Sequence, residues 1–255
     1  MISPKAEIDP KAKIGKNVTI YPFAYIEGDV EIGDDCVIYP YVSIMNGTRL
    51  GRGNKVFQNT VLGAVPQDFN YKGDPSHLII GNGNIIRENV VINRATFSDG
   101  KTVIGNNNFL MEGVHVSHDT KIGNGCVFGY GTKIAGDCVI EDAVIFSSGV
   151  IANPGARVGK ASMVQSGCRF SKDIPPYIIA GREPIAFSGI NIIGLRRRGF
   201  ANEVIENIHN AYRIIYQSGL NTTEALKKIE DEFEKSPEID YIIEFIRNSE
   251  RGIIK

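Results

Sequence analysis

A bulky aliphatic or aromatic side chain recurs at every sixth position through most of the chain from Ile8 to Phe170. Neither the period of 2 of a β-strand nor the period of 3.6 of an α-helix generates this spacing. A six-residue repeat is typical of a parallel β-helix, in which each repeat supplies one short strand and one corner. The repeated positions keep one phase and are Ile8, Ile14, Ile20, Ile26, Ile32, Ile38, Ile44, Leu50, Val56, Leu62, Ile80, Ile86, Ile92, Ile104, Leu110, Val116, Ile122, Phe128, Ile134, Ile140, Phe146, Val158, Val164 and Phe170.

Two other columns of the repeat support this interpretation. Small side chains stand two positions before the aliphatic ones, as at Ala24 and Thr132, where we expect neighbouring faces to crowd. Gly, Asn or Asp stands three positions after many of them, and these residues tolerate the positive φ of a tight turn. All four cysteines fall in the small-residue column, which favours core filling over metal or disulfide roles: Cys36, Cys126, Cys138 and Cys168.

Two insertions interrupt the repeat without changing its phase, at about residues 63–79 and 96–101. Long excursions from a rigid scaffold usually carry function or contacts. The segment from Asp173 to Tyr177 is expected to end the solenoid, and helical periodicity follows. We therefore predict an all-β solenoid over residues 1–190 and a C-terminal α-helical cap over residues 191–255, which would cover the unpaired strand edges.

Three helices are expected in the cap. The first carries Val204, Ile208 and Ala211 on one face and ends before Gly219. Asn221 with Glu224 predicts the start of a second helix, and the step from Ser236 to Pro237 predicts the start of a third.

Charge and hydropathy exclude several classes of protein. The formal net charge is −1, which argues against a general nucleic-acid binder. No run of about 18 apolar residues occurs, and the N-terminus has no signal-peptide pattern, so we expect a cytosolic protein without an integral membrane segment.

If three repeats make one turn, four apolar side chains stack on the outside of one face and predict contact with another chain: Phe109, Val127, Ile145 and Met163.

His118, followed by Asp119, is the main candidate for catalysis. A carboxylate can hold one tautomer of the imidazole and make it a general base near neutral pH. Asp119 also lies in the turn column, where an aspartate is tolerated without any catalytic role. His115 points outward from the preceding strand. A zinc site is less favoured, because His-x-x-His alone is a weak signal and no third ligand is evident.

At these residues the chain resembles a known family, the UDP-N-acetylglucosamine O-acyltransferases of lipid A biosynthesis. The resemblance covers the whole chain. It rests on the six-residue repeat, Gln67-Asp68 with Tyr71, the segment 113–120, the segment 175–177, the arginine-containing segment 191–200 and the helical tail. It implies a left-handed β-helix that forms a homotrimer with active sites between neighbouring subunits. It also implies transfer of a (3R)-3-hydroxyacyl group from acyl carrier protein to the 3-hydroxyl of UDP-N-acetylglucosamine, with no cofactor and no metal.

The resemblance assigns roles to individual residues. His118 matches the general base, Asp119 the carboxylate that orients it, and Gly136 the glycine whose backbone N–H stabilises the oxyanion. Asp68 and His115 match substrate contacts. The remaining matches are Asn191 and Arg198 for the nucleotide, Arg197 for a basic residue near the donor, and Ser166 for the position that sets acyl-chain length.

Four positions depart from the family pattern around the acceptor: Asn70, Asp137, Pro154 and Ile193. They leave open an N-acyltransferase that acts on an amino-sugar nucleotide. A γ-type zinc hydratase on the same solenoid is a less favoured alternative. A non-catalytic scaffold is a third, and the pairing of His115 with His118 argues against it. Acyl-chain length does not follow from the sequence.

Overall fold

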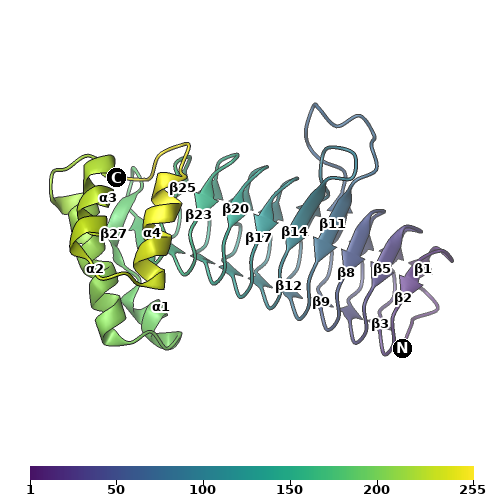
Figure 1. Ribbon diagram of the computed structural model, residues 1–255. Coiled ribbons are helices and arrows are strands. Elements are labelled where there is room, and N and C mark those ends of the chain that lie inside the picture. The colour runs from purple at the N-terminus through teal and green to yellow at the C-terminus, as the bar shows by residue number, and fades with distance from the viewer.

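Short parallel strands coil about a common axis in the computed structural model, which describes residues 1–255 (Figure 1). Most strands have two residues and belong to one of three sheets that form the sides of a left-handed triangular prism. We call the three sheets A, B and C, and their strands are given below. The chain passes from sheet A to sheet B to sheet C and back to sheet A. The prism therefore has three edges, which we call A–B, B–C and C–A. This architecture confirms the predicted β-helix.

Each sheet runs along the length of the solenoid. Sheet A contains β3 (Thr19–Ile20), β6 (Val37–Ile38), β9 (Lys55–Val56), β12 (Ile85–Ile86), β15 (Phe109–Leu110), β18 (Val127–Phe128), β21 (Ile145–Phe146), β24 (Met163–Val164), β26 (Ile178–Gly181) and β27 (Ala186–Ile190). Sheet B contains β1 (Glu7–Ile8), β4 (Tyr25–Ile26), β7 (Ser43–Ile44), β10 (Val61–Ala64), β13 (Val91–Asn93), β16 (His115–Val116), β19 (Lys133–Ile134), β22 (Ile151–Ala152) and β25 (Arg169–Phe170). Sheet C contains β2 (Lys13–Ile14), β5 (Val30–Ile32), β8 (Thr48–Leu50), β11 (His77–Ile80), β14 (Lys101–Ile104), β17 (Lys121–Ile122), β20 (Val139–Ile140) and β23 (Arg157–Val158).

Both insertions leave the prism at its B–C edge, in successive coils. The first connects β10 to β11 and the second connects β13 to β14, so the loops proper span residues 65–76 and 94–100. The first loop projects from the side of the solenoid (Figure 1). The expected bounds were too wide for the first insertion, because Ala64 and residues 77–79 pair with neighbouring coils as strand. Strand pairing tolerates any loop length that returns the chain to sheet C in register.

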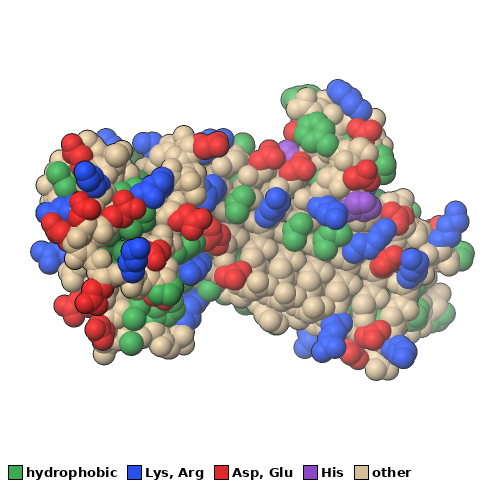
Figure 2. All heavy atoms as spheres, viewed as in Figure 1, with side chains coloured by type: hydrophobic (Ala, Val, Ile, Leu, Met, Phe, Trp, Pro, Cys, Tyr) green, Lys and Arg blue, Asp and Glu red, His purple; other side chains and the backbone are tan.

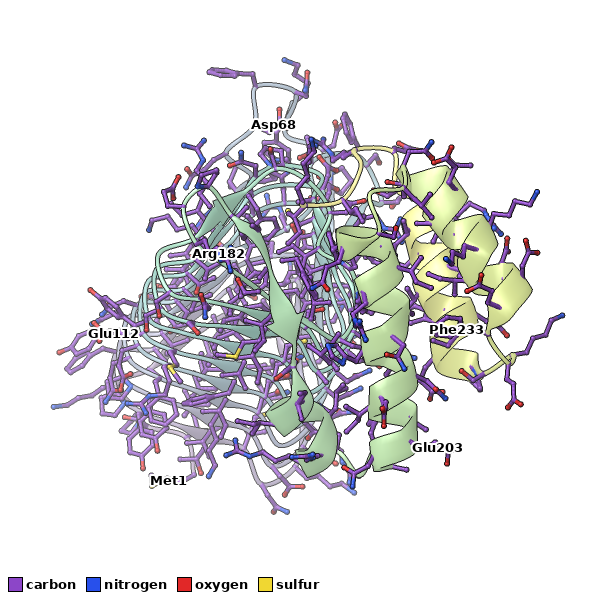
Figure 3. All side chains as sticks on the ribbon, turned by 90° about the vertical axis from the view of Figure 1, so that its left-hand side faces the viewer. Met1, Asp68, Glu112, Arg182, Glu203 and Phe233 are labelled. Carbon is purple, nitrogen blue, oxygen red and sulfur yellow. The ribbon has the colours of Figure 1, made fainter.

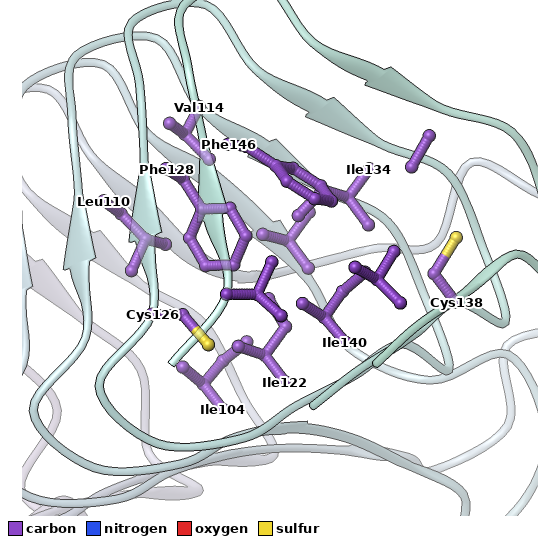
Figure 4. Close-up of a cluster of buried hydrophobic side chains, with 14 of the residues drawn as sticks. Ile104, Leu110, Val114, Ile122, Cys126, Phe128, Ile134, Cys138, Ile140 and Phe146 are labelled. Carbon is purple, nitrogen blue, oxygen red and sulfur yellow. The ribbon is translucent and has the colours of Figure 1, made fainter. Parts of the chain in front are cut away.

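The repeated aliphatic side chains form the core of the prism. All but Ile8 and Ile14, which are partly buried and pack against it, belong to one cluster of 56 buried residues that continues into the C-terminal helices. Phe128, Phe146 and Phe170 stack edge to face in successive coils, with ring centroids 5.5 and 5.8 Å apart. Figure 4 shows Phe128 and Phe146 in the core, together with Cys126 and Cys138. All four cysteines are free and buried, and burial raises the pKa of the Cys126 thiol to about 12, which confirms them as core fillers.

The turn column has positive φ at most of the expected Gly, Asn and Asp residues, although not at Asp29. The same left-handed turn also occurs at residues that do not favour it, including Phe23, Tyr41, Ala143 and Tyr177. The coil must bend at each edge whatever side chain is present, so the geometry of the solenoid overrides local preference there.

A column of asparagines lies inside the C–A edge and was not expected from the aliphatic pattern. Asn84 donates from its backbone and side chain to Asn54 Oδ1, at 2.8 and 2.9 Å, and its own Oδ1 accepts from the backbone N–H of Asn108 at 2.8 Å. Asn108 Oδ1 then accepts from the backbone of Cys126 at 2.7 Å. The three asparagines are buried, so water does not compete for the hydrogen bonds that they form between successive coils.

The solenoid continues past the segment 173–177, where it was expected to end. Strand β26 pairs in parallel with β24 and places Ile179 opposite Met163, which itself lies opposite Ile145 in the coil below. The chain therefore completes this last coil in fewer residues than the coil before it. The shorter coil departs from the phase of the six-residue repeat, so the repeat did not predict strand β26. Strand β27 then turns back antiparallel to β26 and closes the edge of sheet A.

Four helices follow the last strand: α1 (Ile192–Arg197), α2 (Asn202–Gln217), α3 (Thr222–Glu232) and α4 (Pro237–Arg247). The expected starts of α3 and α4 are confirmed by the capping box of Asn221 with Glu224 and by the Ser236 cap before Pro237. Helix α1 was not predicted. Tyr212 of α2 donates to Pro176 O at 2.7 Å, which fastens the helices to the solenoid. None of the four is long and apolar enough to cross a membrane.

The asparagine column predicts an unequal response to two similar substitutions. Replacing Asn84 by Ala leaves the buried Asn108 N–H without an acceptor and removes the side-chain bond to Asn54, and should lower the free energy of unfolding by about 3 kcal/mol. Asn124→Ala removes hydrogen bonds of the same kind from an exposed column, and should cost less than about 1 kcal/mol. Urea unfolding of both variants measures the difference. Equal losses would contradict the proposed role of the buried column.

Candidate active site

His118 lies in the turn between β16 and β17, on the B–C edge of the prism. Its Nδ1 is 2.9 Å from Asp119 Oδ2, and Asp119 has the left-handed φ of +58° that brings its side chain back beside the ring. A carboxylate can only accept a hydrogen bond, so the proton resides on Nδ1. In the neutral ring, Nε2 then carries the lone pair. The pair predicted from sequence is therefore present with the geometry of a base and its orienting carboxylate.

Gly136 stands one coil above His118, and the imidazole fills the space that a side chain would need. A Cβ at Gly136 would lie 2.5 Å from His118 Cε1. No other residue can occupy this position without moving the ring. The backbone N–H of Gly136 donates to no acceptor in the protein, although the neighbouring Asp137 N–H is bonded to His118 O at 3.1 Å. An unused backbone donor thus lies beside the candidate base.

The first insertion brings Asp68 to the other side of the ring. Asp68 Oδ2 is 3.5 Å from His118 Nε2, and both side chains are mostly buried. The loop is held by Arg94, whose guanidinium donates to the Tyr71 hydroxyl at 2.8 Å. Asp68 is labelled on the projecting loop in Figure 3. In Figure 2, hydrophobic side chains appear at the tip of this loop, where Phe69 is fully exposed.

His115 lies on β16 with its side chain outside sheet B, next to Lys133 of β19. Its Nε2 is 3.0 Å from Ser117 Oγ. Burial lowers the pKa of His115, and the nearby charge of Lys133 lowers it further. His115 is therefore neutral near pH 7 and can serve as a hydrogen-bonding side chain rather than as a cation.

Asp119 makes two more hydrogen bonds that sequence reasoning missed. Its backbone N–H donates to Thr102 Oγ1 at 2.8 Å, and its Oδ2 accepts from the backbone N–H of Thr96 at 3.1 Å. Thr96 lies in the second insertion and Thr102 in the strand that follows it. The only signal in the sequence is a threonine in the small-residue column, which by itself indicates core filling.

The nucleotide candidates lie on a different edge. Asn191 is the N-cap of α1; its side chain accepts from Gly194 N at 3.2 Å and donates to Ala161 O at 2.9 Å, so it is engaged within the chain. Arg198 donates to Ala143 O at 2.9 Å, on the C–A edge. Arg197 is exposed beside it, and Ser166 is exposed on the A–B edge. One chain thus brings together Asp68, His115, His118, Asp119 and Gly136, but not the other candidates, whose roles stay predictions.

No group of three or more His, Cys, Asp or Glu side chains is placed so that it could hold a metal ion within the chain. The positions that depart from the expected pattern are accessible. Asp137 and Ile193 are both exposed, and Asn70 donates from its backbone to Asp68 Oδ1 at 2.7 Å. This backbone hydrogen bond supports the conformation of the first insertion and does not depend on the Asn70 side chain.

Family models match both parts of the chain. A model described as UDP-N-acetylglucosamine O-acyltransferase, domain 2, matches residues 173–254. A model described as bacterial transferase hexapeptide repeats matches residues 11–44 and 101–136.

Full-length relatives agree with these models. An acyl-acyl-carrier-protein–UDP-N-acetylglucosamine O-acyltransferase of Halorhodospira halophila is 40% identical and covers 100% of this chain and 99% of its own. A UDP-N-acetylglucosamine acyltransferase structure from Bacteroides fragilis has a TM-score of 0.99 at 63% identity and covers 100% of both chains. One from Francisella novicida has a TM-score of 0.96 at 35% identity, covering 100% of this chain and 94% of that one. By sequence over its full length and by fold, this chain belongs to the UDP-N-acetylglucosamine O-acyltransferase family.

Proposed function

We propose that this protein transfers a (3R)-3-hydroxyacyl group from acyl carrier protein to the 3-hydroxyl of UDP-N-acetylglucosamine, the first step of lipid A biosynthesis. Its relatives are named for an acyl-carrier-protein donor and a UDP-N-acetylglucosamine acceptor, which supports the classes of donor and acceptor. The observation that carries the mechanism is the His118–Asp119 pair, in which Nδ1 is bonded to Asp119 and Nε2 lies on the opposite side of the ring, with an unused N–H of Gly136 beside it.

His118 acts as the general base in this proposal. A sugar hydroxyl has a pKa far above 7 and attacks a thioester slowly unless a base removes its proton as the new bond forms. Nε2 takes that proton, the hydroxyl oxygen bonds to the thioester carbon, and the carbonyl oxygen becomes an oxyanion that the Gly136 N–H can stabilise. Collapse of this intermediate breaks the carbon–sulfur bond, and the imidazolium returns the proton to the leaving thiolate. The thioester is already activated, so the reaction needs no cofactor.

Asp68 occupies the position in front of Nε2 from which the acceptor hydroxyl would approach. We propose that the carboxylate moves aside and binds hydroxyl groups of the sugar when the acceptor enters. Neutral His115 would donate or accept a hydrogen bond on the same side of the pocket. Arg198 and Arg197 would bind the diphosphate and the region near the donor, and Asn191 would help to hold the nucleotide. Ser166 would lie near the end of the acyl chain.

A homotrimer with active sites between subunits would unite the two groups of residues. His118 lies on the B–C edge and Arg198 on the C–A edge, so the two groups face different sides of one prism. A cyclic trimer presents different edges of neighbouring copies to each other at each of its three contacts. The outward stripe of sheet A supports such a contact, because Phe109, Val127 and Ile145 lie in register as an apolar row that is only partly buried in one chain. The buried free cysteines fit a reducing compartment such as the cytoplasm.

The reaction is tested by identifying its product. Purified protein is offered UDP-N-acetylglucosamine or its 3-amino analogue, with a panel of 3-hydroxyacyl carrier proteins of different lengths. We expect an ester of the 3-hydroxyl, identified by mass spectrometry and by its cleavage in mild base. Product formed only from the 3-amino analogue, as a base-stable amide, would show that the acceptor is wrong.

Removal of the proposed base should slow the chemical step selectively. His118→Ala should lower kcat by about 10² to 10⁴, which is the usual contribution of a general base, while leaving binding of the nucleotide sugar nearly unchanged. His209→Ala is the matched control, since His209 is exposed on α2 and should leave kcat at the wild-type value. Steady-state kinetics and calorimetric titration measure the two effects. Wild-type kcat in His118→Ala, or an acyl group trapped on another side chain, would refute the mechanism.

Mixed trimers test whether each site draws on two subunits. With the nucleotide sugar well below its KM, His118→Ala and Arg198→Ala subunits are each expected to be nearly inactive when expressed alone, because the first slows the chemical step and the second weakens nucleotide binding. Co-expressed at equal levels, they should recover activity at about a quarter of the sites, where an intact His118 faces an intact Arg198 across a heterologous contact. Equal amounts of the two variants purified separately provide the control. If co-expression restores nothing, both residues serve the same subunit's site or the trimer does not form.

A further inference from the structure

The second insertion makes direct contact with the side chain that orients His118. The backbone N–H of Thr96, within this loop, donates to the same Asp119 oxygen that accepts from His118 Nδ1. Thr102, in the strand that follows the loop, accepts the Asp119 N–H through its hydroxyl at 2.8 Å. The carboxylate and the backbone of Asp119 are thus held at separate points by the loop and by the strand that follows it.

The hydrogen bond from the Asp119 N–H to the Thr102 hydroxyl replaces a backbone–backbone hydrogen bond that other coils make at the B–C edge. In the next two coils, the equivalent N–H groups of Asp137 and Gly155 donate to backbone carbonyls one coil below, those of His118 and Gly136. Below Asp119, the second insertion diverts the backbone, and the Thr102 hydroxyl serves as the acceptor instead. A side chain therefore does at this one turn what the main chain does in the turns above it.

Burial makes this arrangement rigid. Thr102 is fully buried and Thr96 is 1% exposed, so each hydrogen bond to the partly buried Asp119 is shielded from water on the threonine side. A valine at position 102 would have nearly the shape of threonine, but it would leave the partly buried Asp119 N–H without its acceptor. The turn would then be free to rotate away from the geometry that places the carboxylate on Nδ1.

We propose that Thr102 is a positioning residue: its hydroxyl, together with the Thr96 N–H, fixes Asp119 so that His118 keeps its proton on Nδ1 and presents Nε2 to the acceptor. The second insertion is therefore part of the catalytic apparatus rather than a decoration of the solenoid. The effect on the histidine follows from the contacts alone, and the effect on turnover rests on the proposed function.

The test compares Thr102→Val with Thr102→Ser and Thr48→Val in the full-length protein. Thr102→Ser keeps the hydroxyl. Thr48 is also a fully buried threonine of sheet C, and its hydroxyl donates to Met45 O at 2.7 Å, away from His118. Its column already accommodates Val30 and Leu78, so valine fits there. Imidazole ¹⁵N chemical shifts, recorded at about pH 9 where histidine is ordinarily neutral, report the tautomer of His118.

We expect the Nδ1–H tautomer to dominate in wild-type protein, in Thr102→Ser and in Thr48→Val. In Thr102→Val the His118 resonances should move toward the average of the two tautomers, and kcat should fall about tenfold or more with KM for the nucleotide sugar nearly unchanged. Thr102→Ala provides a second variant if Thr102→Val does not fold.

Unchanged ¹⁵N shifts in folded Thr102→Val or Thr102→Ala would overturn the positioning role, as would a loss of the tautomer in Thr102→Ser. A changed tautomer with unchanged kcat would support the positioning role and overturn His118 as the base. A fall in kcat that Thr48→Val reproduces would reduce the effect to general destabilisation and would also overturn the proposal.

Discussion

The hydrogen bonding of each coil to the coil below it, in constant register, is the constraint on which the rest of this structure depends. It stacks every edge residue over its counterpart, so a functional group on one coil has fixed neighbours above and below. His118 shows the consequence, since Gly136 above it has no side chain and leaves both space for the ring and an unused N–H. Two successive insertions on the same edge then add Asp68 and Thr96 to the same place.

Most of the solenoid was predictable because its side-chain period maps directly onto its geometry. Every sixth residue occupies an equivalent place, so a column of aliphatics identifies the interior without any knowledge of long-range contacts. The exceptions have physical causes. Asn84 lies in the interior because its partners are the asparagines of adjacent coils, which a one-dimensional pattern does not reveal. The coil that ends at β26 is shorter than the coil before it and leaves the phase, so the pattern stops before the solenoid does.

The candidate site was predictable where its parts are neighbours in the sequence. His118 and Asp119 are adjacent, so their types made the pair a candidate base and carboxylate, although the turn column also accounts for Asp119. The contacts of Thr102 and Thr96 with Asp119 span 17 and 23 residues and depend on how an irregular loop returns to the sheet. For Asn191 the family resemblance suggested a nucleotide contact, which stays a prediction, and the sequence did not reveal that the same side chain caps α1 with its amide engaged at both ends. A candidate site made of adjacent residues can be predicted from such a sequence, whereas the contacts that hold it, between residues far apart in the chain, cannot.

A crystal structure of the protein with UDP-N-acetylglucosamine tests the central claim most directly, since it locates the acceptor relative to His118. The account predicts that the 3-hydroxyl lies within hydrogen-bond distance of Nε2, that Asp68 has left Nε2 for the sugar, and that the diphosphate contacts Arg198 of a neighbouring subunit. A sugar bound with its 3-hydroxyl beyond the reach of His118, or a nucleotide held entirely by the subunit that supplies His118, would contradict it.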